Sequence, residues 1–202
     1  MRLVFLGPPG AGKGTQAILL AESHSLLHLS TGDMFRRAIA RGTPTGLKAK
    51  SFMDQGQLVP DDVVDALVDE RLKEEDARSG FVLDGYPRNL TQVTALDGML
   101  VARGTPIEAV IYLDVPDEVL IERIRGRAEA SAAAGQARVD DTEEVARERL
   151  RVYQQHTAPL VDHYEAAGLL RRIDGTTDIG SVRDAVNAAL EGLSSSAGGR
   201  GQ

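Results

Sequence analysis

Short apolar runs alternate along the chain with longer stretches whose apolar residues recur at helical spacing. Five runs have the length and character of strands, at 1–6, 26–29, 80–84, 109–115 and 169–174. All the middle residues of the run at 80–84 are apolar, which is typical of a strand covered on both faces. The pattern therefore predicts an α/β protein in which a parallel five-stranded sheet is flanked by helices.

The helical stretches are predicted at 13–24, 34–40, 46–54, 60–72, 89–102, 116–125, 141–165 and 181–193. Pro159 lies inside the longest of them, so a kink or break is expected near residues 156–158. Residues 30–59 and 126–139 interrupt the alternation and look inserted between strands. Residues 1–193 are predicted to form one domain, and the Ser/Gly-rich tail 194–202 to be disordered.

Composition narrows the class of protein. The chain has 202 residues, of which 42% are hydrophobic, and a net charge of −7, which argues against nucleic-acid or membrane partners. Cysteine is absent, so no disulfide or thiolate zinc site is expected. No apolar run reaches membrane-spanning length, and residues 1–6 are too short for a signal peptide. We expect a cytoplasmic protein.

A glycine-rich loop at 7–16, Gly-Pro-Pro-Gly-Ala-Gly-Lys-Gly-Thr-Gln, follows the first strand and opens the first helix. Strand, glycine loop and helix in this order make a phosphate cradle, because backbone N–H groups and the helix N-terminus face an anion. Lys13 adds a charge for the outer phosphates and Thr15 a hydroxyl for Mg²⁺. Gly14 separates them, whereas the general pattern places Ser or Thr directly after the lysine.

Polar side chains follow two other strands. Asp84 ends a buried strand and is placed to bind Mg²⁺ or its waters, although Asp-Gly is also a common turn pair. Residues 30–33, Ser-Thr-Gly-Asp, end the second strand and cap the next helix. Six arginines fall in or beside predicted loops and helix ends, where they suit phosphoryl transfer: Arg36, Arg88, Arg123, Arg127, Arg138 and Arg149.

Four motifs together resemble the adenylate kinases: the loop at 7–16, Leu-Ser-Thr-Gly-Asp-Met at 29–34, Asp-Gly-Tyr-Pro-Arg at 84–88 and Arg-Val-Asp-Asp at 138–141. The Lys-Gly-Thr variant is typical of nucleoside monophosphate kinases. The resemblance covers nearly the whole chain except the tail. It implies a P-loop NTPase-type sheet with an AMP-binding flap at 30–59 and a short ATP lid at 126–139, and Mg-dependent exchange of ATP and AMP for two ADP by a monomer.

The resemblance also implies residue roles. The ATP site comprises Gly10, Ala11, Gly12, Lys13, Gly14, Thr15, Arg123, Arg127, Gly175 and Thr177. The AMP site comprises Thr31, Arg36, Met53, Gln57, Leu58, Val59, Gly85, Tyr86, Pro87, Arg88, Gln92, Arg138 and Arg149. The catalytic residues are Lys13, Asp84, Arg88, Arg127, Arg138 and Arg149. Thr15, Asp33 and Asp84 organise Mg²⁺, the two carboxylates through water.

The chain departs from the family in places and leaves alternatives open. The lid is short, lacks the cysteines that bind zinc in many bacterial relatives, and is alanine-rich at 129–135, so it could extend the preceding helix. Position 177 is Thr where relatives often have Lys. A UMP/CMP kinase has a similar lid, but Thr31 favours AMP. A regulatory nucleotide-binding protein is a further alternative, although the Asn-Lys-x-Asp motif of GTPases is missing.

Overall fold

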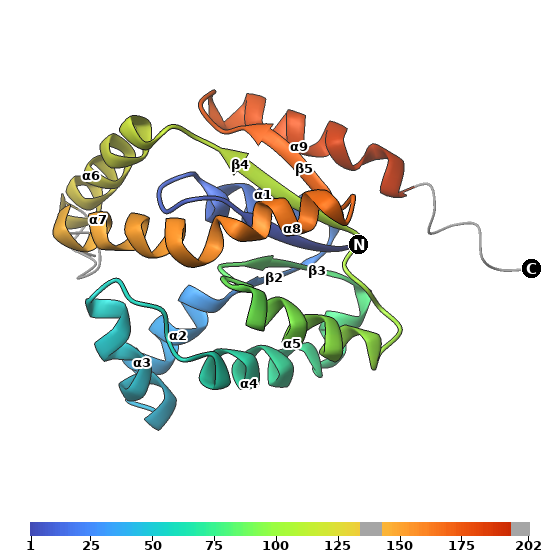
Figure 1. Cartoon of the computed structure of the whole chain (residues 1–202), viewed down its shortest axis with the longest axis horizontal. Helices are drawn as coiled ribbons and strands as arrows, with labels where there is room; N and C mark the ends of the chain where they lie inside the picture. Colours follow the sequence, from blue (N-terminus) through green and yellow to red (C-terminus); the bar gives the residue numbers. More distant parts are fainter. Residues whose placement is uncertain (134–142, 195–202) are drawn as a thin grey trace, which may run out of the picture.

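Five parallel strands form the centre of the molecule in a computed structural model that describes residues 1–133 and 143–194 (Figure 1). They are β1 (Arg2–Leu6), β2 (Leu27–Ser30), β3 (Phe81–Asp84), β4 (Ala109–Asp114) and β5 (Leu170–Asp174). Their order in the sheet is β2-β3-β1-β4-β5, and every pairing is parallel. The predicted fold class is confirmed, and the loop after β1 leaves the middle of the sheet.

Helices cover both faces of this sheet (Figure 1). They are α1 (Lys13–His24), α2 (Thr31–Ala40), α3 (Pro44–Asp54), α4 (Asp61–Leu72), α5 (Leu90–Val101), α6 (Asp117–Ala133), α7 (Glu143–Val152), α8 (Pro159–Ala166) and α9 (Ile179–Ser194). A 3-10 turn, η1 (Glu75–Ser79), precedes β3, and a π-helical turn, η3 (Tyr153–Thr157), joins α7 to α8.

The alternation of side chains along β1 explains the two layers of helices. Leu3 and Phe5 pack in one core cluster with residues of α1 and α9. Val4 and Leu6 pack in the other, with residues of α4, α5 and α8. All four are at most 2% exposed. Each face of the strand is covered, which explains why Leu3 to Leu6 are all apolar and why this run predicted the strand correctly.

Several predicted helix ends differ from the structure; helix α2, for example, begins at Thr31 rather than at residue 34. Helix α3 begins at Pro44 rather than residue 46, because Thr43 accepts a hydrogen bond from the Gly46 N–H at 3.1 Å and proline suits the first helical turn. Helix α6 continues to Ala133 instead of ending near residue 125. The alanine-rich stretch thus extends the preceding helix, since alanine is the best helix former; residues 134–139 of the expected lid lie outside the described residues.

The break expected near residues 156–158 is confirmed. Helix α7 passes into the π-helical turn η3, and Pro159 then takes the first position of α8. The Thr157 hydroxyl donates to the Arg88 carbonyl at 2.8 Å. The interruption therefore attaches this long helical segment to the loop that follows β3.

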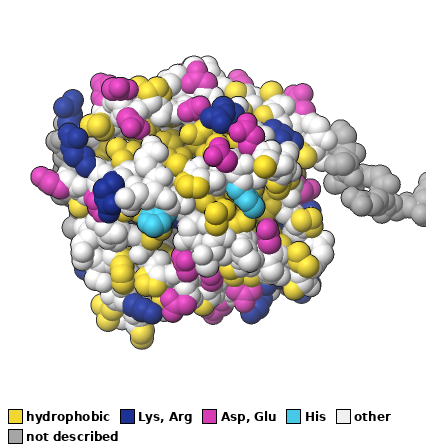
Figure 2. Space-filling model, viewed as in Figure 1, with side chains coloured by type: hydrophobic (Ala, Val, Ile, Leu, Met, Phe, Trp, Pro, Cys, Tyr) yellow, Lys and Arg dark blue, Asp and Glu magenta, His cyan; other side chains and the backbone are white. Residues whose placement is uncertain are grey.

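The described surface carries charges of both signs. Figure 2 shows acidic and basic side chains interspersed over the face drawn, without a broad basic area among the described residues. In residues 1–133 and 143–194, none of the helices combines the length and the apolar character needed to cross a bilayer.

Helices α2 and α3 lie so close that a glycine is required between them. A methyl group at Gly46 would lie 2.3 Å from the carbonyl carbon and oxygen of Ala38. Gly98 of α5 is also helical, but a methyl group there has no heavy atom within 4 Å. A comparison of alanine substitutions at these two glycines therefore separates the effect of a steric clash from the effect of reduced backbone freedom.

We expect Gly46→Ala to lower the free energy of unfolding by roughly 3 kcal/mol, because the added methyl group collides with backbone. Gly98→Ala should instead raise it by about 0.5–1 kcal/mol, since alanine restricts the unfolded chain more than glycine. Urea denaturation followed by circular dichroism measures both. Equal effects of the two substitutions would contradict the close packing of α2 on α3.

Candidate active site

The glycine-rich loop connects β1 to α1 at the carboxyl edge of the sheet. Gly7, Gly10 and Gly12 have φ of +141°, +86° and +94°, a region that other residues rarely adopt. A methyl group at Gly7 would lie 2.8 Å from the Leu113 carbonyl oxygen, whereas a methyl group at Gly12 would have no heavy atom within 4 Å. The loop is thus tight against the sheet and open at the start of α1, as an anion cradle requires.

Lys13 folds back over this loop. Its ammonium group donates to the carbonyl oxygens of Gly7 at 2.7 Å and Pro8 at 2.8 Å. The next residue lies beside the carboxylate at the end of β3: a methyl group at Gly14 would be in ordinary van der Waals contact with Asp84 Oδ2, at 3.4 Å. Thr15, one residue further, is exposed.

Asp84 lies between β1 and β2 in the sheet, in register with Phe5 and Ser30. Its Oδ2 atom is 3.9 Å from His28 Nε2, on the neighbouring strand β2. Burial by itself would raise the pKa of Asp84, but His28, the Lys13 ammonium and the Arg88 guanidinium hold this pKa below its usual value. The carboxylate is consequently kept ionised, in the state that binds a cation.

Asp33 and Arg36 form an ion pair one turn apart on α2. Asp33 Oδ1 accepts from Arg36 Nη2 at 2.6 Å and from Nε at 3.2 Å. The Asp33 backbone N–H donates to Ser30 Oγ at 3.3 Å, which confirms the predicted helix cap. Asp33, expected to organise the cation, and Arg36, expected to bind phosphate, are thus paired with each other here. A ligand phosphate at Arg36 would compete with Asp33.

These side chains fit a magnesium ion that arrives with a nucleotide. Thr15, Asp33 and Asp84 line one cavity together with Lys13. Mg²⁺ is commonly held by one or two carboxylates and substrate phosphates. Within residues 1–133 and 143–194, no group of three or more His, Cys, Asp or Glu side chains could hold a metal ion, so such an ion would depend on the phosphates.

Three cavities with shared walls follow the carboxyl edge of the sheet. The central cavity is lined by Lys13, Thr15, Asp33, Arg36, Asp84, Arg88, Arg123 and Arg149, among others. The flap cavity is lined by residues that include Thr31, Arg36, Met53, Gln57, Leu58, Val59, Gly85, Arg88, Gln92 and Arg149. The α9 cavity is lined by residues that include Gly10, Ala11, Gly12, Thr15, Arg123, Gly175 and Thr177. Arginines therefore line the shared walls: Arg36, Arg88 and Arg149 on one side and Arg123 on the other.

The flap cavity is held between the sheet and the segment 30–59. Thr31 Oγ1 donates to the Gly85 carbonyl at 3.0 Å, which connects α2 to the loop after β3. Gln57 donates from Nε2 to Glu148 on α7. Polar side chains thus attach the flap at both ends.

Two residues expected at the AMP site contribute differently. Tyr86 is fully buried; its hydroxyl donates to Asp65 Oδ1 at 2.7 Å and lies 3.2 Å from the Gln92 carbonyl oxygen. Burial, with the nearby Asp65 carboxylate, raises the Tyr86 pKa, so the hydroxyl remains a donor. Pro87 lines a smaller cavity beside Lys13, Arg88 and Arg149. Tyr86 therefore anchors the loop after β3 to the protein interior rather than forming a cavity wall.

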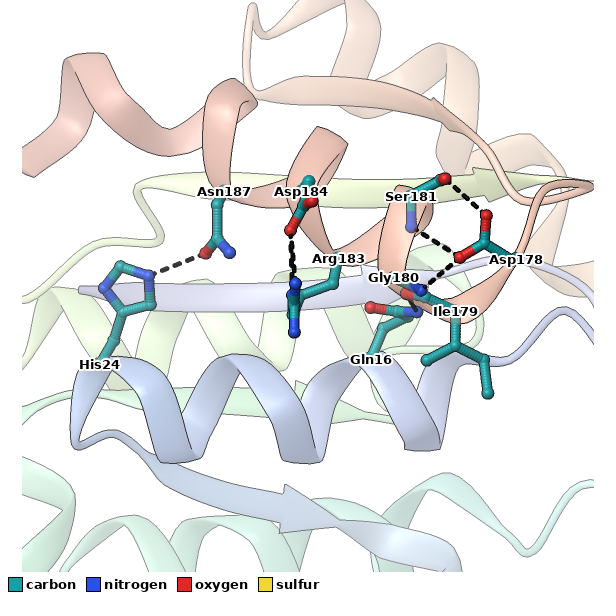
Figure 3. A network of polar contacts seen from close by, with 9 residues as sticks. All are labelled: Gln16, His24, Asp178, Ile179, Gly180, Ser181, Arg183, Asp184 and Asn187. Atoms are coloured by element: carbon teal, nitrogen blue, oxygen red, sulfur yellow. Dashed lines mark hydrogen bonds and ion pairs between the residues drawn. The ribbon is translucent and has the colours of Figure 1, made fainter.

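Helix α9 is attached to α1 beside the α9 cavity (Figure 3). Asp178 accepts from the backbone N–H groups of Gly180 at 2.9 Å and Ser181 at 3.1 Å. Gln16 Nε2 donates to the Ile179 carbonyl at 3.0 Å. On the other wall, Arg123 donates to the Thr176 carbonyl at 3.3 Å, so α1, α6 and the β5–α9 loop are joined around the cavity.

Most of the expected site residues thus line the connected cavities. Arg138 lies outside the described residues, as does the side chain of Arg127. Sequence reasoning missed His28, Asp61 and Glu148, which contact Asp84, Gln92 and Gln57 respectively. Only His28 gave a signal, as a polar residue between two leucines of an apolar strand.

Comparisons with known proteins agree with this geometry. The family model described as adenylate kinase matches residues 5–169. The chain is 51% identical over 194 residues to an adenylate kinase of Methylorubrum populi, covering 96% of this chain and 97% of that protein. It is 52% identical to one of Methylobacterium nodulans, over 96% and 98% of the two chains. An adenylate kinase of Stenotrophomonas maltophilia is 49% identical, over 95% and 100%.

Proposed function

The chain belongs to the adenylate kinase family, and we propose that it transfers the terminal phosphoryl group of ATP to AMP, reversibly and with Mg²⁺, to give two ADP. The observation that carries this proposal is the row of three cavities, with a phosphate loop in the middle and arginines on both shared walls. Such a row suits two nucleotides that meet at their phosphates.

The donor nucleotide is assigned to the central and α9 cavities. The loop from Gly10 to Thr15 holds its phosphates, and Arg123 and Arg127 contact them from α6. Gly175 and Thr177 lie beside the base. Thr15, Asp33 and Asp84 would organise the Mg²⁺ ion that accompanies ATP, and this ion would supply positive charge against the phosphates. Fixed donors around the phosphates cost no reorganisation when the charge shifts.

The acceptor nucleotide is assigned to the flap cavity. Thr31, Gln92 and the flap residues Met53, Gln57, Leu58 and Val59 enclose the base. Arg36 and Arg88 hold the acceptor phosphate, while Arg138 and Arg149 approach the transferring group, because guanidinium groups bind phosphate oxygens in pairs. Direct transfer between bound nucleotides needs positioning and charge stabilisation and no covalent enzyme intermediate.

The same assignment proposes a division of the chain. Residues 1–193 form one kinase domain, in which 30–59 is the AMP-binding segment and 126–139 the ATP lid. The hydrogen bond from Gln57 to Glu148 supports a flap whose position is coupled to that of α7. Adenine nucleotides are the proposed partners of a cytoplasmic monomer without zinc.

AMP should be the preferred acceptor over UMP and CMP. We expect kcat/KM for AMP, at saturating Mg-ATP, to exceed the values for UMP and CMP at least about 100-fold, because a site built for one base leaves polar groups unpaired with another. A coupled ADP assay measures all three. Faster phosphorylation of UMP would identify a UMP/CMP kinase instead, and nucleotide binding without turnover would identify a regulatory protein.

A further inference from the structure

Gln92 is fixed at both ends of its amide group. It lies in the first turn of α5, is 2% exposed and lines the flap cavity. Its Nε2 donates to Asp61 Oδ1 at 2.7 Å, and its Oε1 accepts from the backbone N–H of Arg88 at 2.7 Å. The side chain is therefore held by two groups from separate segments of the chain.

The chemistry of these two partners decides which way the amide points. An ionised carboxylate only accepts hydrogen bonds, and a backbone N–H only donates. If the amide turned by 180°, its carbonyl would face Asp61 and its NH₂ group would face the Arg88 N–H. Both contacts would become unfavourable, and the Gln92 side chain, which is 2% exposed, has little access to water that could replace them, so the observed orientation is favoured.

Asp61 is itself held in place. It is the first residue of α4, where the helix N-terminus favours a negative charge. Asn89 Nδ2 donates to Asp61 Oδ1 at 2.9 Å and to Oδ2 at 3.2 Å. Asn89 Oδ1 in turn accepts from the Gln92 backbone N–H at 2.9 Å. The carboxylate and the start of α5 thus form one hydrogen-bonded unit.

We propose that Asp61 is a specificity-determining residue, which by orienting the Gln92 amide selects a 6-aminopurine over a 6-oxopurine as the acceptor base. An amide has two N–H donors and two acceptor positions, and the protein contacts named above use one of each. The remaining pair matches adenine, whose N1 accepts and whose 6-amino group donates. Hypoxanthine presents the opposite pair, an N1–H donor and an O6 acceptor. This inference rests on the proposed function, with the acceptor base beside Gln92.

The test compares AMP with IMP as acceptors, because these nucleotides differ only at N1 and C6 of the base. Asp61→Ala should lower the ratio of kcat/KM for AMP to kcat/KM for IMP at least about tenfold, since water that replaces the carboxylate can donate as well as accept. Asp62→Ala is the matched control: its side chain is 76% exposed and its neighbour in the helix is the residue under test. This control should keep the wild-type ratio.

A structural role alone would reduce the activity with AMP and IMP by the same factor, and an unchanged ratio in a folded Asp61→Ala protein would overturn the proposal. Thermal unfolding shows whether the variant folds. If it does not, Asp61→Asn, which can both accept and donate, should lower the ratio by a smaller factor, and an unchanged ratio there would overturn the proposal equally. Absence of AMP phosphorylation by the wild-type protein would instead refute the proposed function.

Discussion

Lys13→Ala is expected to lower kcat at least about 1,000-fold, because the proposed function assigns the Lys13 ammonium to the phosphates of ATP, whose charge it would neutralise during transfer. The Lys13 ammonium lies over the loop, 2.7 Å from the Gly7 carbonyl oxygen, and its charge helps to keep Asp84 ionised. The chain has 23 Lys and Arg residues. A guanidinium is planar and larger than an ammonium, so a neighbouring arginine is not expected to take over the position of the Lys13 ammonium in the variant. Initial rates of ADP formation at saturating ATP and AMP measure the loss.

The matched control is Lys73→Ala. Lys73, directly after α4, is 64% exposed and pairs with Asp69 of that helix, and neither residue lines the three cavities. Its removal should leave kcat within a factor of two, because exposed ion pairs contribute little. The melting temperatures of the two variants should be similar to that of the wild type. Activity of a folded Lys13→Ala protein within tenfold of wild type would contradict the assigned role of the loop.

The sheet could be predicted because its signal is local. The apolar runs of the inner strands, such as Val82 and Leu83 in β3, are covered on both faces and are recognised without information from distant residues. The order of the strands follows from contacts between distant segments, so the sequence pattern did not contain it. Helix α6 shows the opposite difficulty: the segment 126–139 looked inserted and suggested an end near Arg125, whereas helical propensity continued through the alanines to Ala133.

Residue types predicted which side chains gather at the site, but not how they pair. The motifs placed Asp33 and Arg36 at the same edge of the sheet, and the structure shows that they bind each other. Gln92 was expected at the acceptor base, but its partner Asp61 begins a helix that the sequence only marked as acidic. Such pairs depend on distances of a few ångströms between separate elements, which spacing along the chain does not define.

Arg88 joins these local contacts to the site as a whole. Its Nε donates to the Gly85 carbonyl at 2.8 Å, and its backbone carbonyl accepts from Thr157 at 2.8 Å. With its backbone N–H on Gln92, the residue is attached to three separate partners. Its side chain lines both the central and the flap cavity. Under the proposed function, Arg88 is therefore the residue that we expect to contact the phosphoryl group during its transfer between the nucleotides.

Arg88→Lys should accordingly lower kcat and kcat/KM together, by about 100-fold or more, because the ammonium keeps the charge but loses the planar pair of donors that fits phosphate oxygens. Arg71→Lys is the control, since Arg71, in the last turn of α4, makes a bidentate pair with Asp76, both distances 2.7 Å. It should leave both parameters unchanged. A rise in KM for AMP with unchanged kcat in Arg88→Lys would assign Arg88 to binding of the acceptor alone, because a contact made equally in the ground and transition states does not alter the rate of the bound complex.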